Sequence, residues 1–284
     1  MQSIQHWFGK WLLLTLFWFV LNSIDFSQLQ LTDFSKDALI GRAMMSILDS
    51  LILCWILARS SKRGSPLVLV IFLAVFGMKI GLTVIEAAYL PVLRPIIFSL
   101  IMNGAISSLL WSLTAVAFTV GFSNTSLSLD RLESLDWQQK WFQWILKSLL
   151  LAILWMVLFV IFGVFVFMNL ARLIDPQALA TYSNLDMPAW VLPFQGFRAL
   201  LWLGLSLPLL MQLRGSLINV MILTASIFGI WMGSNLFLAF DLPVGLRYAH
   251  LAEVMVECFV FGALVVAIFA WKPHTPFVPS EQSL

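Results

Sequence analysis

One stretch of the sequence, residues 247–257 (RYAHLAEVMVE), gathers basic, acidic and imidazole side chains within an otherwise apolar run. At 100° per residue, four of them fall within about 120° of one another around a helix: Arg247, His250, Glu253 and Glu257. An imidazole and two carboxylates on one stripe can exchange protons, form ion pairs or face a common cation. A metal ion needs a further firm ligand, and the other histidines stand near the ends of the chain. We therefore expect a polar cavity or buried ion pairs here, with no metal and no cofactor.

Three more ionisable residues interrupt apolar segments: Asp49, Lys79 and Glu86. Charges inside a bilayer are costly and rarely face lipid, so they pair, line a cavity or carry out a function. Lys79 lies about 14 Å from the outer end of its helix at 1.5 Å per residue, a depth that Asp49 and Glu253 share. We expect Lys79 to pair with Asp49 or Glu253, because burying either sign alone costs several kcal/mol. The predicted substrate or ion pathway consists of Asp49, Lys79, Glu86, His250, Glu253 and Glu257.

Arginines at the outer ends of predicted helices form a second pattern: Arg42, Arg94, Arg198 and Arg247. The planar guanidinium fork suits phosphate and carboxylate groups. A ring of these side chains is expected to contact a small anionic solute or a lipid headgroup. The sequence leaves open the alternative that the arginines only reach lipid phosphates at the interface.

The chain that must position these residues is too apolar to face water. It has 284 residues, of which 61% are hydrophobic and 11% charged, and its mean hydropathy is +0.96, whereas soluble domains carry about 25% charged residues. A net charge of +2 argues against a nucleic-acid partner. The composition predicts an all-α, polytopic membrane helix bundle whose partner is the lipid bilayer, located in a bacterial inner membrane.

Polar and proline-containing breaks divide the chain into eight predicted transmembrane helices. They lie near 7–24, 38–58, 66–88, 95–121, 142–170, 191–211, 216–239 and 244–271. The excess of Lys and Arg on one side places the N- and C-termini in the cytoplasm.

The sequence also repeats itself. FGMKIGLTVIEAAYLPV (76–92) returns as FGIWMGSNLFLAFDLPV (228–244), and KWLLLTLFWFVL (10–21) returns as KSLLLAILWMVL (147–158). The order is kept, so we predict two parallel four-helix repeats. The expected units are residues 1–121, a cytoplasmic connection 122–140, residues 141–271 and a cytoplasmic tail 272–284. Close helix packing is expected at small residues four apart: Gly77, Gly81, Gly229 and Gly233.

The two copies differ where Lys79 aligns with Trp231 and Glu86 with Leu238. We therefore expect one asymmetric polar site between the second, third and eighth helices. The favoured function is a carrier of small solutes or ions. A non-catalytic membrane scaffold protein is the alternative, and a lipid-handling enzyme with an outer arginine site is a weaker one. No nucleotide-binding or hydrolase motif supports an enzyme.

Overall fold

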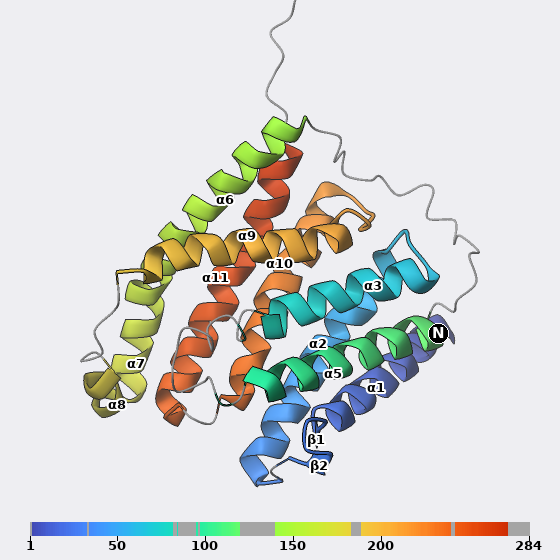
Figure 1. Cartoon of the computed structure of the whole chain (residues 1–284), viewed down its shortest axis with the longest axis horizontal. Helices are drawn as coiled ribbons and strands as arrows, with labels where there is room; N and C mark the ends of the chain where they lie inside the picture. Colours follow the sequence, from blue (N-terminus) through green and yellow to red (C-terminus); the bar gives the residue numbers. More distant parts are fainter. Residues whose placement is uncertain are drawn as a thin grey trace, which may run out of the picture.

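The computed structural model describes residues 2–32, 34–81, 84, 95, 97–119, 140–182, 189–239 and 242–271, and most of their regular structure is helical (Figure 1). The first half contains α1 (Gln2–Leu21), α2 (Lys36–Arg59), α3 (Gly64–Val75), the π-helix η1 (Phe76–Gly81) and α5 (Ile97–Thr119). The second contains α6 (Trp141–Phe162), the π-helix η4 (Gly163–Phe167), α7 (Met168–Ile174), α8 (Pro176–Tyr182), α9 (Val191–Leu210), α10 (Leu217–Gly233), the 3-10 helix η5 (Ser234–Leu238) and α11 (Val244–Ala270). Two short strands, β1 (Ile24–Asp25) and β2 (Gln30–Leu31), pair antiparallel.

Six of the described helical segments are long and apolar enough to cross a membrane, by length and composition. They are α2, α3 with η1, α5, α6 through α7, α10 with η5, and α11. The chain is therefore a multi-pass, all-α membrane protein. Helices also occupy the other two expected places, as α1 and α9, but the apolar part of α1 is the shorter stretch Trp7–Leu21.

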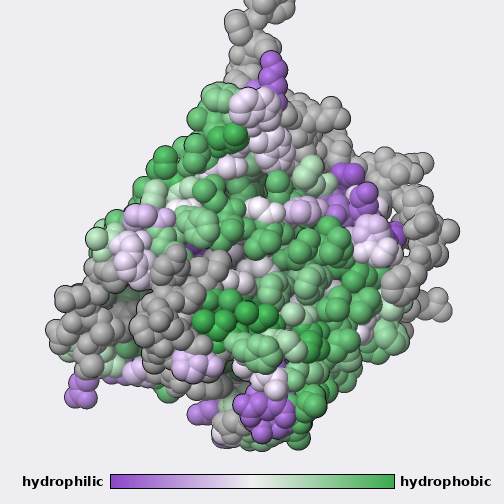
Figure 2. Space-filling view, in the orientation of Figure 1, coloured by the Kyte–Doolittle hydropathy of each residue, from purple (hydrophilic) through white to green (hydrophobic). Residues whose placement is uncertain are grey.

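The outer surface of the bundle is apolar, as a lipid-facing surface must be. Figure 2 shows a mostly hydrophobic face over α3, α5 and α9, with hydrophilic residues toward its edges. Large side chains such as Leu16, Leu51, Leu149 and Ile153 are exposed. Lipid offers no hydrogen bonds to backbone groups. Helices can still have such a surface, because their backbone hydrogen bonds are made within each helix.

Each half packs in the same order. α1 contacts α2 and α5 in the first half, and α6 contacts α9 and α11 in the second. The halves meet where α2 packs on α10 and α9 packs on α3. Buried tryptophans fill the contacts within each half: Trp18 stacks on Trp111 with ring centroids 4.2 Å apart, and Trp155 meets Phe261 edge to face at 5.1 Å.

Three of the four predicted packing glycines lie against a neighbouring helix. A Cβ on Gly77 would come within 2.5 Å of a Leu205 methyl group, a Cβ on Gly229 would lie 2.8 Å from the Met255 carbonyl oxygen, and Gly233 abuts the Met255 side chain. Gly81 differs, since the nearest described atom is in its own helix at 3.7 Å. Its place in a π-helix turns it away from the α-helical face that four-residue spacing assumes.

We predict that Gly229→Ala destabilises the protein by about 1 to 3 kcal/mol, because the new methyl group must separate α10 from α11. Gly204→Ala in α9 is the matched control, because a Cβ there has no described atom within 4 Å and alanine favours the helix. The measurement is the thermal unfolding midpoint in detergent. Equal midpoints for the two variants would contradict the close approach.

The turn between α2 and α3 pairs with the turn between α9 and α10. Ser60 and Leu213 form an isolated antiparallel bridge. The Ser61 amide donates to the Gln212 carbonyl, and the Arg214 amide donates to the Arg59 carbonyl, both at 2.9 Å. The two halves are thus joined through the backbone at this end of the bundle.

The β1–β2 hairpin, which follows the C-terminal end of α1, is held on α5 by Asn103. The Asn103 side-chain oxygen accepts from the Phe26 amide at 2.7 Å, and its nitrogen donates to Asp25 Oδ1 at 3.0 Å. The Ser27 hydroxyl donates to the same carboxylate oxygen at 2.6 Å. These bonds, first from Ser27 and then from Asn103, lower the pKa of Asp25 below its usual value of 3.8.

A lowered folded-state pKa means that Asp25 stabilises the fold above the unfolded-state value and that this contribution is lost as the pH falls through the folded-state value. We expect wild type to unfold at a higher temperature than Asp25→Asn at neutral pH, and the difference to shrink below pH 3.8 and to vanish once the pH is below the lowered folded-state pKa. Thermal midpoints of both proteins across this range test the expectation. A difference that persists into strong acid would show that the amide, not the lost charge, is responsible.

Candidate functional site

The first charged cluster is an ion pair buried between α2 and η1. Lys79 Nζ lies 2.8 Å from Asp49 Oδ2, and the two residues are only 4% and 0% exposed. The expectation that Lys79 pairs with one of two carboxylates is thus resolved in favour of Asp49. An opposite charge at this distance offsets much of the desolvation that either group suffers alone.

Neutral groups complete the cluster and tie it to three further elements. Lys79 Nζ donates to Ser234 Oγ at 2.6 Å and to the Trp231 carbonyl at 3.1 Å, so that with Asp49 these groups give the ammonium three acceptors among the described residues. Ser234 Oγ donates to Asp49 Oδ1 at 2.7 Å, and Trp18 Nε1 donates to Asp49 Oδ2 at 2.9 Å. We call Asp49, Lys79, Ser234, Trp18 and Trp231 the ion-pair network. It joins α1, α2, η1, α10 and η5.

Irregular helix geometry makes these bonds possible. Lys79 is in a π-helix, whose wider turn redirects side chains relative to an α-helix. α10 ends at Gly233 and continues as a 3-10 helix, a change of bonding pattern that leaves the Trp231 carbonyl available to Lys79. The Asn235 side chain in turn donates to the Lys79 carbonyl at 2.9 Å. Each irregular segment therefore satisfies polar groups of the other.

A cavity of about 390 Å³ borders the ion-pair network. Besides Lys79, its lining includes several polar side chains: Asn22, Thr32, Asn103, Ser107, Ser108 and Asn235. We call it the polar cavity. It lies among α1, α2, α5 and the two irregular segments.

The second charged cluster is on α11. His250 Nδ1 lies 2.6 Å from Glu253 Oε2, and their side chains are 39% and 5% exposed. A carboxylate at Nδ1 fixes the ring and leaves Nε2 for another partner. Glu253 is also close to η4, because a Cβ on Gly163 would lie 3.5 Å from its Oε1. The Phe167 ring meets the imidazole edge to face at 5.8 Å.

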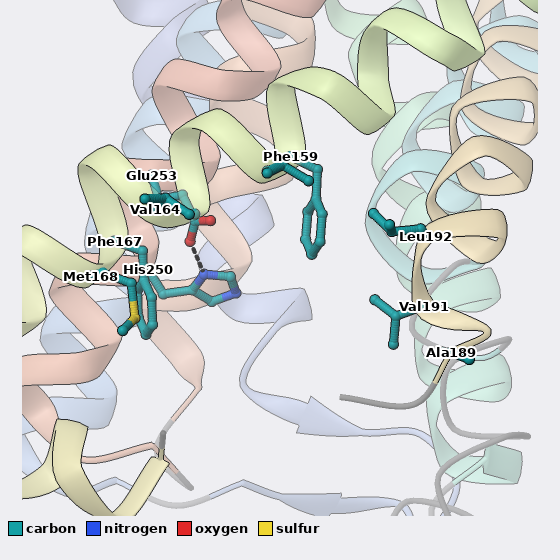
Figure 3. Close-up of a pocket in the computed structure, with 11 residues that line it drawn as sticks. Phe159, Val164, Phe167, Met168, Ala189, Val191, Leu192, His250 and Glu253 are labelled. Atoms are coloured by element: carbon teal, nitrogen blue, oxygen red, sulfur yellow. Dashed lines mark hydrogen bonds and ion pairs between the residues drawn. The ribbon is translucent and has the colours of Figure 1, made fainter. Parts of the chain in front are cut away.

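This pair lines a larger cavity of about 550 Å³ (Figure 3). The His250 ring points into the cavity, and Phe159, Leu192 and Val191 stand across from it. The rest of the described wall comes from η4, the start of α7 and the residues around the start of α9, and it is mainly apolar. We call it the apolar cavity. Its volume is within the range of about 300 to 1,000 Å³ that is typical of small-molecule sites.

Glu257 is one turn further along α11 and is 2% exposed. Its Oε1 has no hydrogen-bond partner among the described residues. The charges that act on it are those of Glu253 and of Arg198 on α9. Arg198 itself lies over the Trp202 ring at 4.5 Å. Glu257 therefore interacts electrostatically with Glu253 on its own helix and with Arg198 on α9.

The described arginines do not gather around either cavity. Arg42 lies over the Phe34 ring, Arg247 over the Tyr248 ring and Arg198 over Trp202. Within the described part of the chain, no arginine lines the polar or the apolar cavity. A shared anion site at these arginines remains a proposal without a described pocket.

The geometry differs from the single asymmetric site that the sequence suggests. Lys79 and Asp49 form one cluster beside the polar cavity, whereas His250 and Glu253 form another beside the apolar cavity. Equal depth along helices does not fix which faces meet, and the alternative in which Lys79 pairs with Glu253 assumed that it did. Glu86 and Arg94 lie outside the described residues, as do most of the connection 122–140 and the tail 272–284.

Sequence reasoning missed the neutral partners in both clusters. Ser234 and Trp18 carry no charge and give no signal in an apolar run, although Trp231 does align with Lys79 in the repeated line. The apolar wall of the second cavity is also indistinguishable from core or lipid-facing sequence. The two π-helices have no periodicity that would reveal them.

Comparison with known proteins gives no guide to this site, because no family model, curated protein or solved structure matches the chain.

We predict that Lys79→Met destabilises the protein by about 3 to 5 kcal/mol, because it leaves the Asp49 carboxylate buried without its counter-ion. The double variant Asp49→Asn with Lys79→Met should recover part of this loss, since no net charge then remains in the network. Thermal midpoints and yield from membranes are the measurements.

Lys147→Met is the control for removing a buried lysine, because Lys147 Nζ donates only to the Phe269 and Trp271 carbonyls among its described acceptors. It should cost less than Lys79→Met. A double variant no more stable than Lys79→Met alone would argue against charge pairing as the source of the effect.

Proposed function

We infer that the protein is a membrane carrier for a small solute. In this proposal it consists of two parallel four-helix repeats, the His250–Glu253 pair in the apolar cavity is the binding site, and the ion-pair network is the joint between the repeats. The proposal assigns different functions to the two charged clusters.

The observation that carries the proposal is the presence of His250 and Glu253 in the wall of a cavity of about 550 Å³. Glu253 lies about 14 Å from the start of α11 at 1.5 Å per residue, near the middle of a bilayer core that is about 30 Å thick. Ionisable groups at that depth mark substrate, ion or proton pathways in membrane proteins. Carriers built from repeats bind near this level, between moving bundles.

Contacts between aligned residues support the repeat. Lys79 and Trp231 align in the two copies of the repeated line and touch each other, and the two RGS-containing turns, residues 59–65 and 211–216, pair with each other. Trp18 and Trp155, which also align, each pack on the last helix of their own half. Pairs of equivalent positions that meet each other are expected around a two-fold axis between two like units.

The same correspondence supports eight spans. α1 corresponds to α6 and α9 corresponds to α2 in their order and packing partners. The partners α6 and α2 both qualify as spans by length and composition. If repeat mates have the same path, α1 and α9 cross the membrane as well.

A carrier must expose its site to one side of the membrane and then to the other, and this can be tested without knowing the solute. We propose Phe159→Cys as the reporter, because Phe159 lines the apolar cavity, in a background with the buried Cys54 and Cys258 replaced by alanine. A membrane-impermeant thiol reagent should label it both in right-side-out and in inside-out vesicles.

Ile153→Cys is the matched control, because Ile153 is on the same helix and exposed but does not contribute to the cavity lining. It should stay unlabelled from both sides if it faces lipid. Labelling of Phe159→Cys from one side only would refute alternating access.

A scaffold protein is the second candidate, and the complete set of protein acceptors around the Lys79 ammonium favours it. A scaffold needs no access to its interior. Failure of the reagent to reach Phe159→Cys from either side would support this candidate over the carrier.

A further inference from the structure

The walls of the apolar cavity exclude most classes of solute. Eight described side chains supply its apolar surface: Phe159, Val160, Val164, Phe167, Met168, Ala189, Val191 and Leu192. A sugar, a nucleotide or an inorganic ion would lose hydrogen bonds to water here without replacement, at a cost of about 1 to 3 kcal/mol for each polar group. The occupant must therefore be largely apolar.

One polar group faces this apolar space. Glu253 holds Nδ1 of His250, and Figure 3 shows the ring with its other nitrogen directed into the cavity. With Nδ1–H donated to an ionised carboxylate, Nε2 is an acceptor. The pair then carries one negative charge, and the described lining contains no lysine or arginine to balance it. Arg198, whose charge acts on Glu257 one turn further along α11, is not part of the lining.

Aromatic rings add to the preference for positive charge. Phe167 packs edge to face on the imidazole, and Phe159 stands on the other side of the cavity. The face of a phenylalanine ring attracts cations. The chemistry of the site is thus an anionic acceptor with aromatic neighbours in an otherwise apolar chamber.

We propose that the apolar cavity binds a hydrophobic amine in its ammonium form. The ammonium N–H donates to His250 Nε2, the Glu253 carboxylate balances the charge, and the carbon skeleton lies among the eight apolar side chains. The proposal rests on the carrier function above, since it names the solute class that this cavity carries. It also replaces the small anion that the outer arginines suggest, because the described ones, Arg42, Arg198 and Arg247, do not line the cavity.

The test is equilibrium binding to the full chain in lipid nanodiscs. The probe is 2-(1-naphthyl)ethylamine, followed by its fluorescence, and empty nanodiscs correct for partition into lipid. The matched neutral compound is 2-(1-naphthyl)ethanol, which has the same skeleton without the charge. We expect the amine to bind at least about tenfold more tightly than the alcohol. Equal affinities would overturn the proposal in favour of a purely apolar site.

Variants locate the binding. Glu253→Gln and His250→Leu should each weaken amine binding at least about tenfold while leaving the weak binding of the alcohol unchanged. Asp25→Asn is the matched control for removing a carboxylate, because Asp25 lies in the β1–β2 hairpin outside this cavity. This variant should bind the amine with the affinity of wild type. Amine binding that survives both cavity substitutions would place the site elsewhere and overturn the proposal.

If those two variants fail to fold, Val164→Trp provides an independent test, because it fills the cavity without removing a polar group. It should abolish binding of the amine, and retained binding would refute the site. The results are separable from the carrier test. Two-sided labelling with no preference for the amine leaves a carrier of another solute, whereas amine binding with one-sided labelling leaves a receptor-like site and no carrier.

Discussion

The ion pair between Asp49 and Lys79 is the contact on which the interior of this bundle depends. The bilayer core contains no water that could bind an unpaired charge or backbone group. Both residues must therefore find their partners within the protein. Their partners come from α1, α2, η1, α10 and η5. Satisfying one pair of charges therefore fixes the relative positions of helices from both halves. The tryptophans around it, Trp18 and Trp231, add apolar packing to the same place.

The two cavities show how one packing plan holds different chemistry. Each lies between the first, second and last helices of its half. The polar cavity is lined by amide and hydroxyl side chains beside Lys79, whose charge is balanced by Asp49. The apolar cavity carries a histidine and a glutamate whose charges are not balanced by a described basic residue in its wall. Lys79 in the wall of the polar cavity already has Asp49 as its counter-ion, whereas the wall of the apolar cavity contains no described basic residue beside the His250–Glu253 pair. The proposed function is placed in the apolar cavity for this reason.

The sequence was sufficient to predict helices in all eight places and to narrow the partner of Lys79 to Asp49 or Glu253, because apolar runs and charge pairing are strong local constraints. It did not show that Glu253 and Lys79 belong to two different clusters, since the face that a helix turns to its neighbours depends on tertiary packing. Gly81 shows the same limit: a four-residue spacing implies a shared face only in an α-helix, and a π-helix breaks that rule. Ser234 shows a second limit of prediction from sequence, because a neutral hydroxyl becomes important only when two charged groups lie beside it.

The close succession of α2 and α3 has a consequence for how the chain enters the membrane. Asp49 and Lys79 are on consecutive helices joined by the short turn at residues 60–63. The two charges can therefore neutralise each other within a single helical hairpin as it leaves the insertion machinery. Trp231 and Ser234 are synthesised much later, when this hairpin is already in place. The first half thus enters the bilayer with this pair of charges matched, and Asp49 and Lys79 are in place to bind Trp231 and Ser234 when the second half assembles against them.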